Sequence, residues 1–443
     1  MSAPSTAHQV LIDLRTPRRR FSLDAPSFLL HQWKVGRLTS YGAANPGLSE
    51  AFDLDTARTV EGWMPSYEVA VIGLGAMGSA ALYAAANRGL RVIGFDRYEP
   101  AHARSSSYGE SRVIRLAYFE HPSYVPLLRE AYELWLALEK ASGQRVLTIT
   151  GMIEAGYSGA PLVQRSLQSA IEHGLPHERL TAAETNIRFP AFNLPGDWDV
   201  IFQPDGGALL PEKAISLFVA GAEDNGATVR QGTQVVSVEP AGDGVRIALK
   251  GGEHIEACSA IVSAGAWIGD LLPDVAAGMR LTRQPLMWFQ PREPGLVGPD
   301  RMPVFLFQTP HDLIYGLPNL CGTGVKAASH LDGGTLTSAE AARAEVSPEE
   351  ASYLHGTIER YVPAAAGALR NTSLCIYTRS PDEHFVVGLH PKASQLVIAS
   401  PCSGHGFKFA SVMGEILADL AQYRRTDRPI DLFQPKRLLT RPL

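Results

Sequence analysis

Residues 67–96 read YEVAVIGLGAMGSAALYAAANRGLRVIGFD and predict a strand, a glycine-rich turn, a helix and a second strand, in that order. The apolar run 67–72 is rich in valine, as strands are. Residues 79–88 are dominated by alanine, which has a high helix propensity. Residues 91–95 form the second apolar run, and Asp96 ends it. This order predicts the βαβ unit of a dinucleotide-binding α/β fold.

The turn between the strand and the helix carries Gly73, Gly75 and Gly78 in the pattern GxGxxG. In dinucleotide-binding proteins the first glycine permits the tight turn, the second lets the backbone approach a pyrophosphate, and the third lets helix and strand pack closely. The helix N-terminus offers N–H groups and partial positive charge to that anion, and Asp96 is placed to accept hydrogen bonds from ribose hydroxyls. The turn alone leaves open a flavin dinucleotide, a nicotinamide dinucleotide and a βαβ turn without nucleotide.

The composition of the chain excludes several classes of protein. Its 443 residues suffice for two or three domains, and a net charge of −5 without a dense lysine block gives no reason to expect nucleic acid. No apolar run approaches the ~18 residues of a membrane helix. The cysteines are too few and too scattered for a disulfide scaffold or a zinc site, which favours a reducing cytoplasm and no metal. They are Cys258, Cys321, Cys375 and Cys402.

Residues 1–65 lack strong periodicity, and we expect a weakly ordered extension or a segment that docks a partner. Arg15 and the run 18–20 faintly resemble a twin-arginine export signal, but no apolar stretch of the required length follows. Met64 stands directly before the first strand and is a candidate natural start.

Further regular elements are expected along the rest of the chain. Their patterns predict a helix over 124–142, a hairpin or meander over 227–249, a strand over 260–262, short strands and turns over 287–377 (including 302–307 and 313–317), a strand over 395–399, a glycine turn over 403–406 and a helix over about 409–423.

Several segments together resemble the monomeric sarcosine oxidase family, which includes N-methyltryptophan and pipecolate oxidases within the D-amino-acid-oxidase-like flavoproteins. The segments are the glycine turn with its Asp96, residues 105–115 (SSSYGESRVIR), residues 375–378 (CIYT) with 382–385 (DEHF), and residues 403–409 (SGHGFKF). The resemblance runs from about residue 66 to the C-terminus, and the last two segments are the most specific.

The resemblance implies an α/β fold in which a Rossmann-like FAD-binding domain is interleaved with a mixed β-sheet substrate domain. We expect the FAD domain in 66–147, 204–278 and 380–440, and the substrate domain in 148–203 and 279–379. It also implies that FAD is attached through its 8α-methyl carbon to the sulfur of Cys375, whereas the other cysteines are interpreted as small buried hydrophobes.

Two cations are implied as partners of the substrate carboxylate. By pattern alone, Arg112 and Arg115 would be a solvated or salt-bridged pair. The resemblance implies instead that Arg112 lies beside the flavin ring and that Arg115 binds the substrate carboxylate. The planar guanidinium of an arginine suits this role because it can bind a carboxylate through two hydrogen bonds. Lys408 is implied as the second partner, and its place at a helix start is electrostatically unfavourable. Gly404 and Gly406 are expected to bring N–H donors toward the flavin pyrimidine.

The resemblance assigns the remaining catalytic positions. A lone lysine such as Lys326 is normally a surface residue, but here it is implied to lie near flavin N5 and to stabilise superoxide. His330, Tyr315 and Tyr377 are implied in the amine site, although each aromatic could equally be a packed core residue. Tyr108 stands where sarcosine oxidases often have histidine. Further cofactor contacts are implied for Ala76, Met77, Arg97, His102, Ser106, Val235, Gly265, Trp267 and His405.

The implied function is oxidation of a secondary-amine amino acid, such as sarcosine, another N-methyl amino acid or pipecolate, to an imine while O2 is reduced to H2O2. Which amine is oxidised is left open. We expect a monomer that uses a small amino-acid substrate. Three alternatives stay open: an FAD-dependent dehydrogenase with another electron acceptor, an NAD-dependent reductase, and a catalytically silent flavin-binding protein whose residues 1–65 dock a partner.

Overall fold

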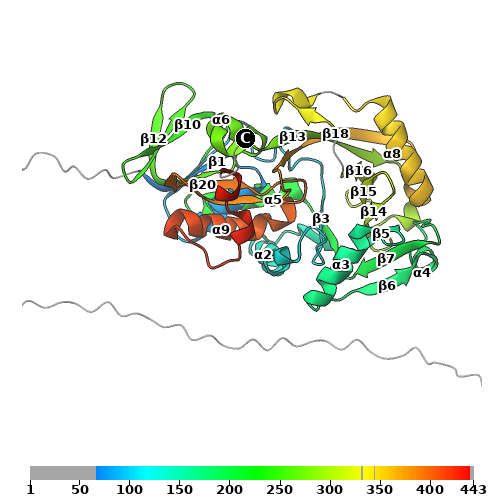
Figure 1. Cartoon of the computed structure of the whole chain (residues 1–443). Coiled ribbons are helices and arrows are strands. Elements are labelled where there is room, and N and C mark those ends of the chain that lie inside the picture. The colour runs from blue at the N-terminus through cyan, green and yellow to red at the C-terminus, as the bar shows by residue number, and fades with distance from the viewer. Residues whose placement is uncertain (1–65, 331–332, 344, 440–443) are drawn as a thin grey trace, which may run out of the picture. The chain divides into compact units, whose positions relative to one another are not determined.

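The computed structural model describes residues 66–330, 333–343 and 345–439. The expectations for residues 1–65 lie outside the described residues. Figure 1 shows two large sheets within residues 66–439, with β1, β12 and β20 in one and β5, β7, β14, β15 and β16 in the other. Among the described residues, no helix is both long enough and apolar enough to cross a bilayer.

The predicted βαβ unit is confirmed. Strand β1 (Tyr67–Ile72) pairs in parallel with β2 (Val92–Phe95), and helix α1 (Ala76–Asn87) connects them. The helix begins at Ala76, not at residue 79 as the alanine run suggested, because Gly78 takes part in the first turn. Its missing side chain makes this possible, since a Cβ at Gly78 would lie 1.8 Å from the carbonyl oxygen of Gly73.

The remaining strands of the first sheet extend it on both sides in the order β10-β11-β12-β1-β2-β9, with β20 and then β19 attached at β12. The predicted meander is present as an antiparallel β10-β11-β12 unit. The strands are β9 (Thr228–Arg230), β10 (Val235–Ala241), β11 (Gly244–Leu249), β12 (His254–Val262), β19 (Val386–His390) and β20 (Ala393–Ser400). The helices packed with α1 or near it are α2 (Val125–Ser142), α5 (Pro211–Asp224) and α9 (Ala410–Tyr423), and the short helices are α6 (Ile268–Leu271), α7 (Pro273–Ala276) and α10 (Lys436–Leu439).

The second sheet is mixed, as expected: β14 pairs in parallel with β5, while its other pairs are antiparallel. Its order is β17-β13-β16-β15-β14-β5-β7-β6, with β18 beside β13. The strands are β5 (Met152–Tyr157), β6 (Glu178–Thr181), β7 (Trp198–Gln203), β13 (Arg280–Phe289), β14 (Val304–Gln308), β15 (Leu313–Leu317), β16 (Val325–Ser329), β17 (Thr335–Leu336) and β18 (Leu369–Arg379), and helices α3 (Pro161–Glu172) and α4 (Ala182–Arg188) accompany them.

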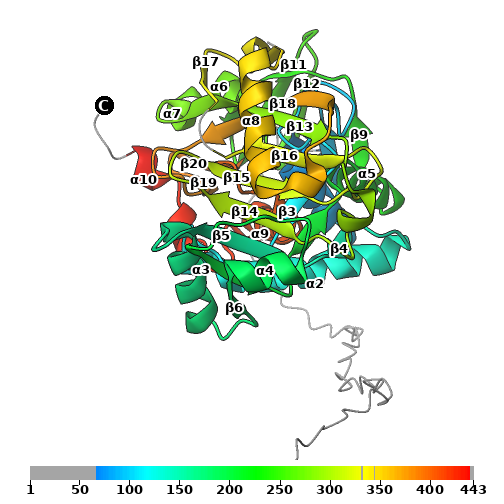
Figure 2. The ribbon, with the colours of Figure 1, turned by 90° about the vertical axis from the view of Figure 1, so that its right-hand side faces the viewer.

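The expectation of only short strands and turns over 287–377 was wrong. Helix α8 (Pro348–Tyr361) lies in this region and crosses the mixed sheet in Figure 2. The sequence contains its start signal, because Ser347 and Glu350 form a capping box. The helix is held to the sheet by one apolar face, on which Leu354 and Ile358 are buried in the core.

A small third sheet has the order β3-β8-β4. It consists of β3 (Arg112–Ile114), β8 (Gly207–Leu209) and β4 (Leu147–Ile149), and Figure 1 draws β3 between the two large sheets. Glycine permits the close approach of β8 to its neighbour, since a Cβ at Gly207 would lie 2.2 Å from the carbonyl oxygen of Thr148. This sheet fixes Arg112 and, one residue beyond its end, Arg115.

Candidate active site

One elongated cavity collects nearly all the residues that the sequence nominated. It encloses about 1770 Å³ of empty space, including its opening to solvent. The nominated residues that line it are Gly73, Gly75, Ala76, Met77, Asp96, Arg97, His102, Ser106, Arg112, Arg115, Val235, Gly265, Trp267, Tyr315, His330, Cys375, Tyr377, Gly404, His405, Gly406 and Lys408. Two others, Gly78 and Lys326, lie behind the lining and support it.

The glycine turn forms a cradle at one end of the cavity. Gly73 has φ +93°, a conformation that favours glycine, and a Cβ there would meet the carbonyl oxygen of Ser263 at 2.6 Å. At Gly75, by contrast, no described atom lies within 4 Å of the position of an added Cβ. The backbone at Gly75 is therefore open to the cavity at the N-terminus of α1, which fits the pyrophosphate of a dinucleotide.

Asp96 holds this cradle in shape. One carboxylate oxygen accepts the N–H of Leu74 at 2.7 Å, and the other accepts the N–H of Tyr98 at 2.9 Å. Burial raises the pKa of Asp96, against the effect of these hydrogen bonds. Each carboxylate oxygen has further acceptor capacity, so hydroxyl groups of a ribose are suitable partners at this point of the cavity.

Farther along the cavity, Arg112 and Cys375 lie together. The guanidinium of Arg112 donates to the carbonyl oxygens of Ser106 at 3.0 Å and Tyr108 at 2.6 Å, and one of its nitrogens is 3.8 Å from the sulfur of Cys375. The thiol itself is 2% exposed and donates to the carbonyl oxygen of Ser106 at 3.1 Å. The sulfur of Cys375 therefore lies between the Arg112 guanidinium and the backbone of Ser106.

Lys326 supports the loop that precedes Arg112. Its ammonium is 1% exposed and donates to the carbonyl oxygens of Gly109 and Ser111, both at 2.7 Å. Burial lowers the pKa of Lys326 well below its usual value. Glu212, which was not predicted from the sequence, accepts the N–H of Gly109 at 2.6 Å. Lys326 and Glu212 thus hold the carbonyl oxygen and the N–H of Gly109, respectively.

The other end of the cavity holds Arg115 between two carboxylates. Arg115 donates to Glu120 at 2.6 Å, and its Nε is 3.0 Å from an oxygen of Glu154, without hydrogen-bond geometry. The rings of Tyr118 and Phe119 lie 4.5 and 4.8 Å from the guanidinium carbon. Although burial alone raises the pKa of Glu120, the nearby positive charges, of Arg115 above all, lower it to about 2. Neither carboxylate was predicted from the sequence.

Lys408 approaches the same end of the cavity. It lies in the 3-10 turn η6 (Phe407–Phe409) immediately before α9, close to the predicted helix start. Its ammonium donates to the carbonyl oxygen of His405 at 2.8 Å and lies 3.5 Å from the hydroxyl of Tyr118. Burial, assisted by the charge of Arg115, lowers the pKa of Lys408 to about 7.

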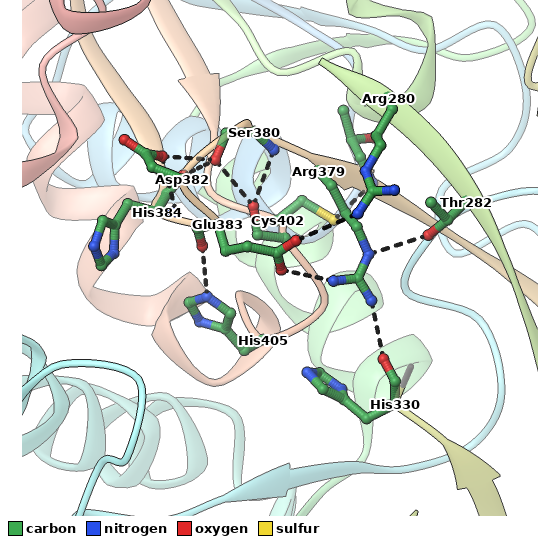
Figure 3. A network of polar contacts seen from close by, with 12 residues as sticks. Arg280, Thr282, His330, Arg379, Ser380, Asp382, Glu383, His384, Cys402 and His405 are labelled. Carbon is green, nitrogen blue, oxygen red and sulfur yellow. Dashed lines mark hydrogen bonds and ion pairs between the residues drawn. The ribbon is translucent and has the colours of Figure 1, made fainter. Parts of the chain in front are cut away.

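Two neutral histidines face this region, and Figure 3 shows the ion pair that ties them together. Arg379 donates to the carboxylate of Glu383 at 2.6 Å and to the carbonyl oxygen of His330 at 2.9 Å. The carbonyl oxygen of Glu383 is 3.1 Å from a ring nitrogen of His405. Burial lowers the pKa of His330 to about 3 and that of His405 to about 4, so both rings are neutral at physiological pH.

The wall around this end of the cavity is apolar and aromatic. Tyr315 and Tyr377 both line it, and burial raises the pKa of each hydroxyl. The rings of His330 and Tyr377 lie 5.8 Å apart. Apolar lining residues that the sequence analysis did not name are Val113, Phe119, Met152 and Leu306. The arrangement combines cations, neutral bases and an apolar wall, as small-molecule sites do.

Comparison with known proteins selects among the alternatives left by the glycine turn. The profile of the family described as FAD dependent oxidoreductase matches residues 68–420. A monomeric sarcosine oxidase from Streptomyces avermitilis is 36% identical over 382 residues, covering 85% of this chain and 99% of the relative. An N-methyl-L-tryptophan oxidase from Yersinia pestis is 30% identical over 369 residues, covering 83% and 97%.

Solved structures agree on the fold. NikD, described as an unusual amino acid oxidase essential for nikkomycin biosynthesis, has a TM-score of 0.75 at 25% identity and covers 84% of this chain and 98% of its own. Glycine oxidase from Geobacillus kaustophilus has a TM-score of 0.71 at 19% identity and covers 85% and 99%. The family profile and the two oxidase relatives select FAD over a nicotinamide dinucleotide, and an enzyme over a silent binding protein. The chain belongs to the family of FAD dependent oxidoreductases and is an enzyme of the sarcosine-oxidase type that acts on CH–NH bonds.

Proposed function

We propose that this enzyme oxidises an amino acid carrying a secondary amine to the imine and reduces O2 to H2O2. The single observation that carries the proposal is the convergence of Arg115, Lys408 and two neutral histidines on the cavity that the glycine cradle also lines. The cations suit a carboxylate, and the neutral rings add no positive charge that would disfavour binding of an amine.

The residues present fit FAD, with its adenosine-diphosphate half at Gly75 and Asp96 and its ring toward Arg112. When bound, FAD supplies the redox chemistry, accepting a hydride equivalent from the amine and returning electrons to O2. We further propose covalent attachment at Cys375, supported by the Arg112 guanidinium 3.8 Å from the thiol. Acid precipitation tests this: a colourless pellet, with all the flavin in the supernatant, would exclude the attachment.

The substrate carboxylate takes the place of Glu120 on Arg115. Glu120 lines the cavity and its side chain keeps 13% exposure, so it already occupies the anion position with an internal carboxylate. A substrate carboxylate exchanges with it, and protonated Lys408 supplies a second positive charge. Binding is thus an exchange of one carboxylate for another, which avoids leaving the buried guanidinium unpaired at any stage.

The amine lies toward Tyr315, Tyr377 and His330 in this proposal. A secondary amine must be neutral to give up a hydride equivalent from its neighbouring carbon, and the nearby rings are neutral. Water hydrolyses a linear imine after release. For Lys326 we propose that its side chain, in the protonated form, stabilises the superoxide formed during oxidation by O2, acting from behind the loop 109–111. We also propose a cytoplasmic monomer, in line with the monomeric relatives.

A panel of amines tests the proposed function. Sarcosine, N-methyltryptophan, pipecolate and their primary-amine counterparts are offered to the flavin-loaded enzyme with air as the only oxidant. Peroxide formed in proportion to amine consumed supports an oxidase. Flavin reduction by the amine without peroxide would favour the runner-up, a dehydrogenase with another electron acceptor. Failure of every secondary amine to reduce the flavin would refute the proposal.

A further inference from the structure

Glu154 is a buried carboxylate that the proposed reaction does not use. It lies in β5, whose other residues are Met152, Ile153, Ala155, Gly156 and Tyr157. Successive side chains of a strand alternate between its faces, so Glu154 shares a face with Met152, which lines the cavity. Ile153 and Ala155 point the other way into an apolar core. Glu154 is 0% exposed, and a buried carboxylate is strongly destabilising unless it has partners.

Its contacts tie Glu154 to the segment that carries Arg115. One oxygen is 3.0 Å from Nε of Arg115. The other accepts a hydrogen bond from the side-chain amide of Gln203 at 2.9 Å, and the amide oxygen of Gln203 accepts the N–H of Ala117 at 3.0 Å. Because its second oxygen is held by Gln203 on the neighbouring strand β7, the carboxylate has one fixed position beside the guanidinium.

The two carboxylates on Arg115 differ in their access to the cavity. Glu120 lines the cavity, whereas Glu154 does not. A ligand that enters the cavity therefore competes with Glu120 and leaves Glu154 in place. We propose that Glu154 is a positioning residue, which holds the guanidinium of Arg115 through a carboxylate outside the cavity lining and so presents a fixed cation to the substrate carboxylate. This inference rests on the proposed function, in which Arg115 binds that carboxylate.

The charged groups around Glu154 are Arg115, Glu120 and Lys408, and Tyr118 is a further titratable neighbour. The polar groups that face it from β7 and α3, Gln203 and Ser166, are uncharged. Burial raises the pKa of Glu154 to about 7, against the effect of Arg115. Below that pH the side chain is mostly neutral but keeps its length and its polar contact with Arg115, so positioning and charge are separable at pH 6.

The experiment measures binding of propionate, a carboxylate without an amine, to the flavin-loaded protein at pH 6 through the change in flavin absorption. Glu154→Leu removes the polar partner of the Arg115 guanidinium, and we expect the Kd of propionate to rise roughly tenfold, as for a residue coupled directly to the binding group. Glu154→Gln keeps the length and an acceptor oxygen, and we expect a Kd within about twofold of wild type. Rescue by the amide distinguishes positioning from a general loss of structure. Should Glu154→Leu not fold, Glu154→Asp withdraws the acceptor by one carbon and is expected to weaken binding as well.

An Arg115→Met background tests whether Glu154 acts through Arg115. We expect Glu154→Leu to cause no further loss of propionate binding there, because the group that it positions is already gone. Glu130→Leu is the matched control: Glu130 pairs with Arg428 away from the cavity, and its removal is expected to leave the Kd unchanged.

Unchanged or tighter propionate binding in folded Glu154→Leu would overturn the inference, as would an equal further loss in the Arg115→Met background. Failure of the proposed function looks different, because propionate binding would follow these expectations while no secondary amine reduced the flavin.

Discussion

Substitution of Glu120 by glutamine tests the exchange of carboxylates at Arg115. Glu120 donates no proton in this contact: its pKa of about 2 keeps it ionised at every working pH, and it accepts from the guanidinium at 2.6 Å. Glu120→Gln leaves Arg115 paired with Glu154, so we expect the variant to fold and to retain flavin. It removes the internal anion with which an entering carboxylate competes, and affinity for carboxylate ligands should therefore increase.

The size of the increase follows from the contact. Two unit charges about 4 Å apart at an effective dielectric constant of about 20 interact by about 4 kcal/mol, which is an upper limit here. A hydrogen bond to a charged group contributes a net ~1.5–3 kcal/mol. That range corresponds to a Kd for propionate roughly ten- to a hundredfold lower in Glu120→Gln.

The assay is titration with propionate, followed by flavin absorption, with Glu130→Gln as a control of equal charge change outside the cavity. Glu130 accepts a hydrogen bond from Arg428 at 2.6 Å. Its substitution is expected to leave the affinity for propionate unchanged. Weaker or unaltered binding in folded, flavin-loaded Glu120→Gln would refute the exchange, since it would mean that Glu120 does not occupy the ligand position.

Three further predictions concern the two ends of the cavity. Gly78→Ala is expected to prevent stable folding of the cradle, because its Cβ would lie 1.8 Å from a carbonyl oxygen, whereas Gly75→Ala should fold with a Tm near wild type yet bind FAD poorly. Flavin content and thermal melting check both expectations. Normal flavin binding in both variants would contradict the assignment of the cradle to FAD. Lys326→Met leaves two carbonyl oxygens without their donor, so we expect the free energy of unfolding to fall by about 1–3 kcal/mol. We also expect the reduced enzyme to react more slowly with O2, as measured by stopped flow. Unchanged reactivity with O2 would exclude the proposed role of Lys326. Propionate binding should weaken as the pH rises through about 7, because Lys408 loses its positive charge there while Glu154 gains a negative one. Lys408→Met should therefore remove part of the pH dependence of the Kd. A Kd independent of pH between 6 and 8 would contradict the titration of both groups in this range.

Local sequence patterns predicted the elements whose form is decided locally. The glycine turn, the strands on either side of it and helix α2 were recognisable because periodicity and glycine spacing determine them. Helix α8 was not predicted, although Ser347 and Glu350 form a recognisable capping box at its start. Helix α1 begins earlier than expected because Gly78 is helical in this tertiary context.

The site was predictable only in part, because several of its contacts join residues far apart in the sequence. Glu154 stands in an otherwise apolar strand, and that mismatch was the one sign of a special role; its partner Arg115 comes from a different sheet. Glu120 and Arg379 resemble ordinary surface charges in the sequence and acquire meaning only through burial beside the cavity. The position of Lys326 behind a loop depends on β16 packing against that loop, which no local pattern indicates.

The central claim is that one cavity joins an FAD cradle to a site that binds a secondary-amine amino acid by its carboxylate. Its most direct test is anaerobic mixing of the flavin-loaded enzyme with each member of the amine panel, followed by admission of air. We expect that at least one secondary-amine amino acid bleaches the flavin, that its decarboxylated analogue does not, and that air restores the colour with one H2O2 per amine oxidised. Equal bleaching by an amine that lacks the carboxylate would contradict it.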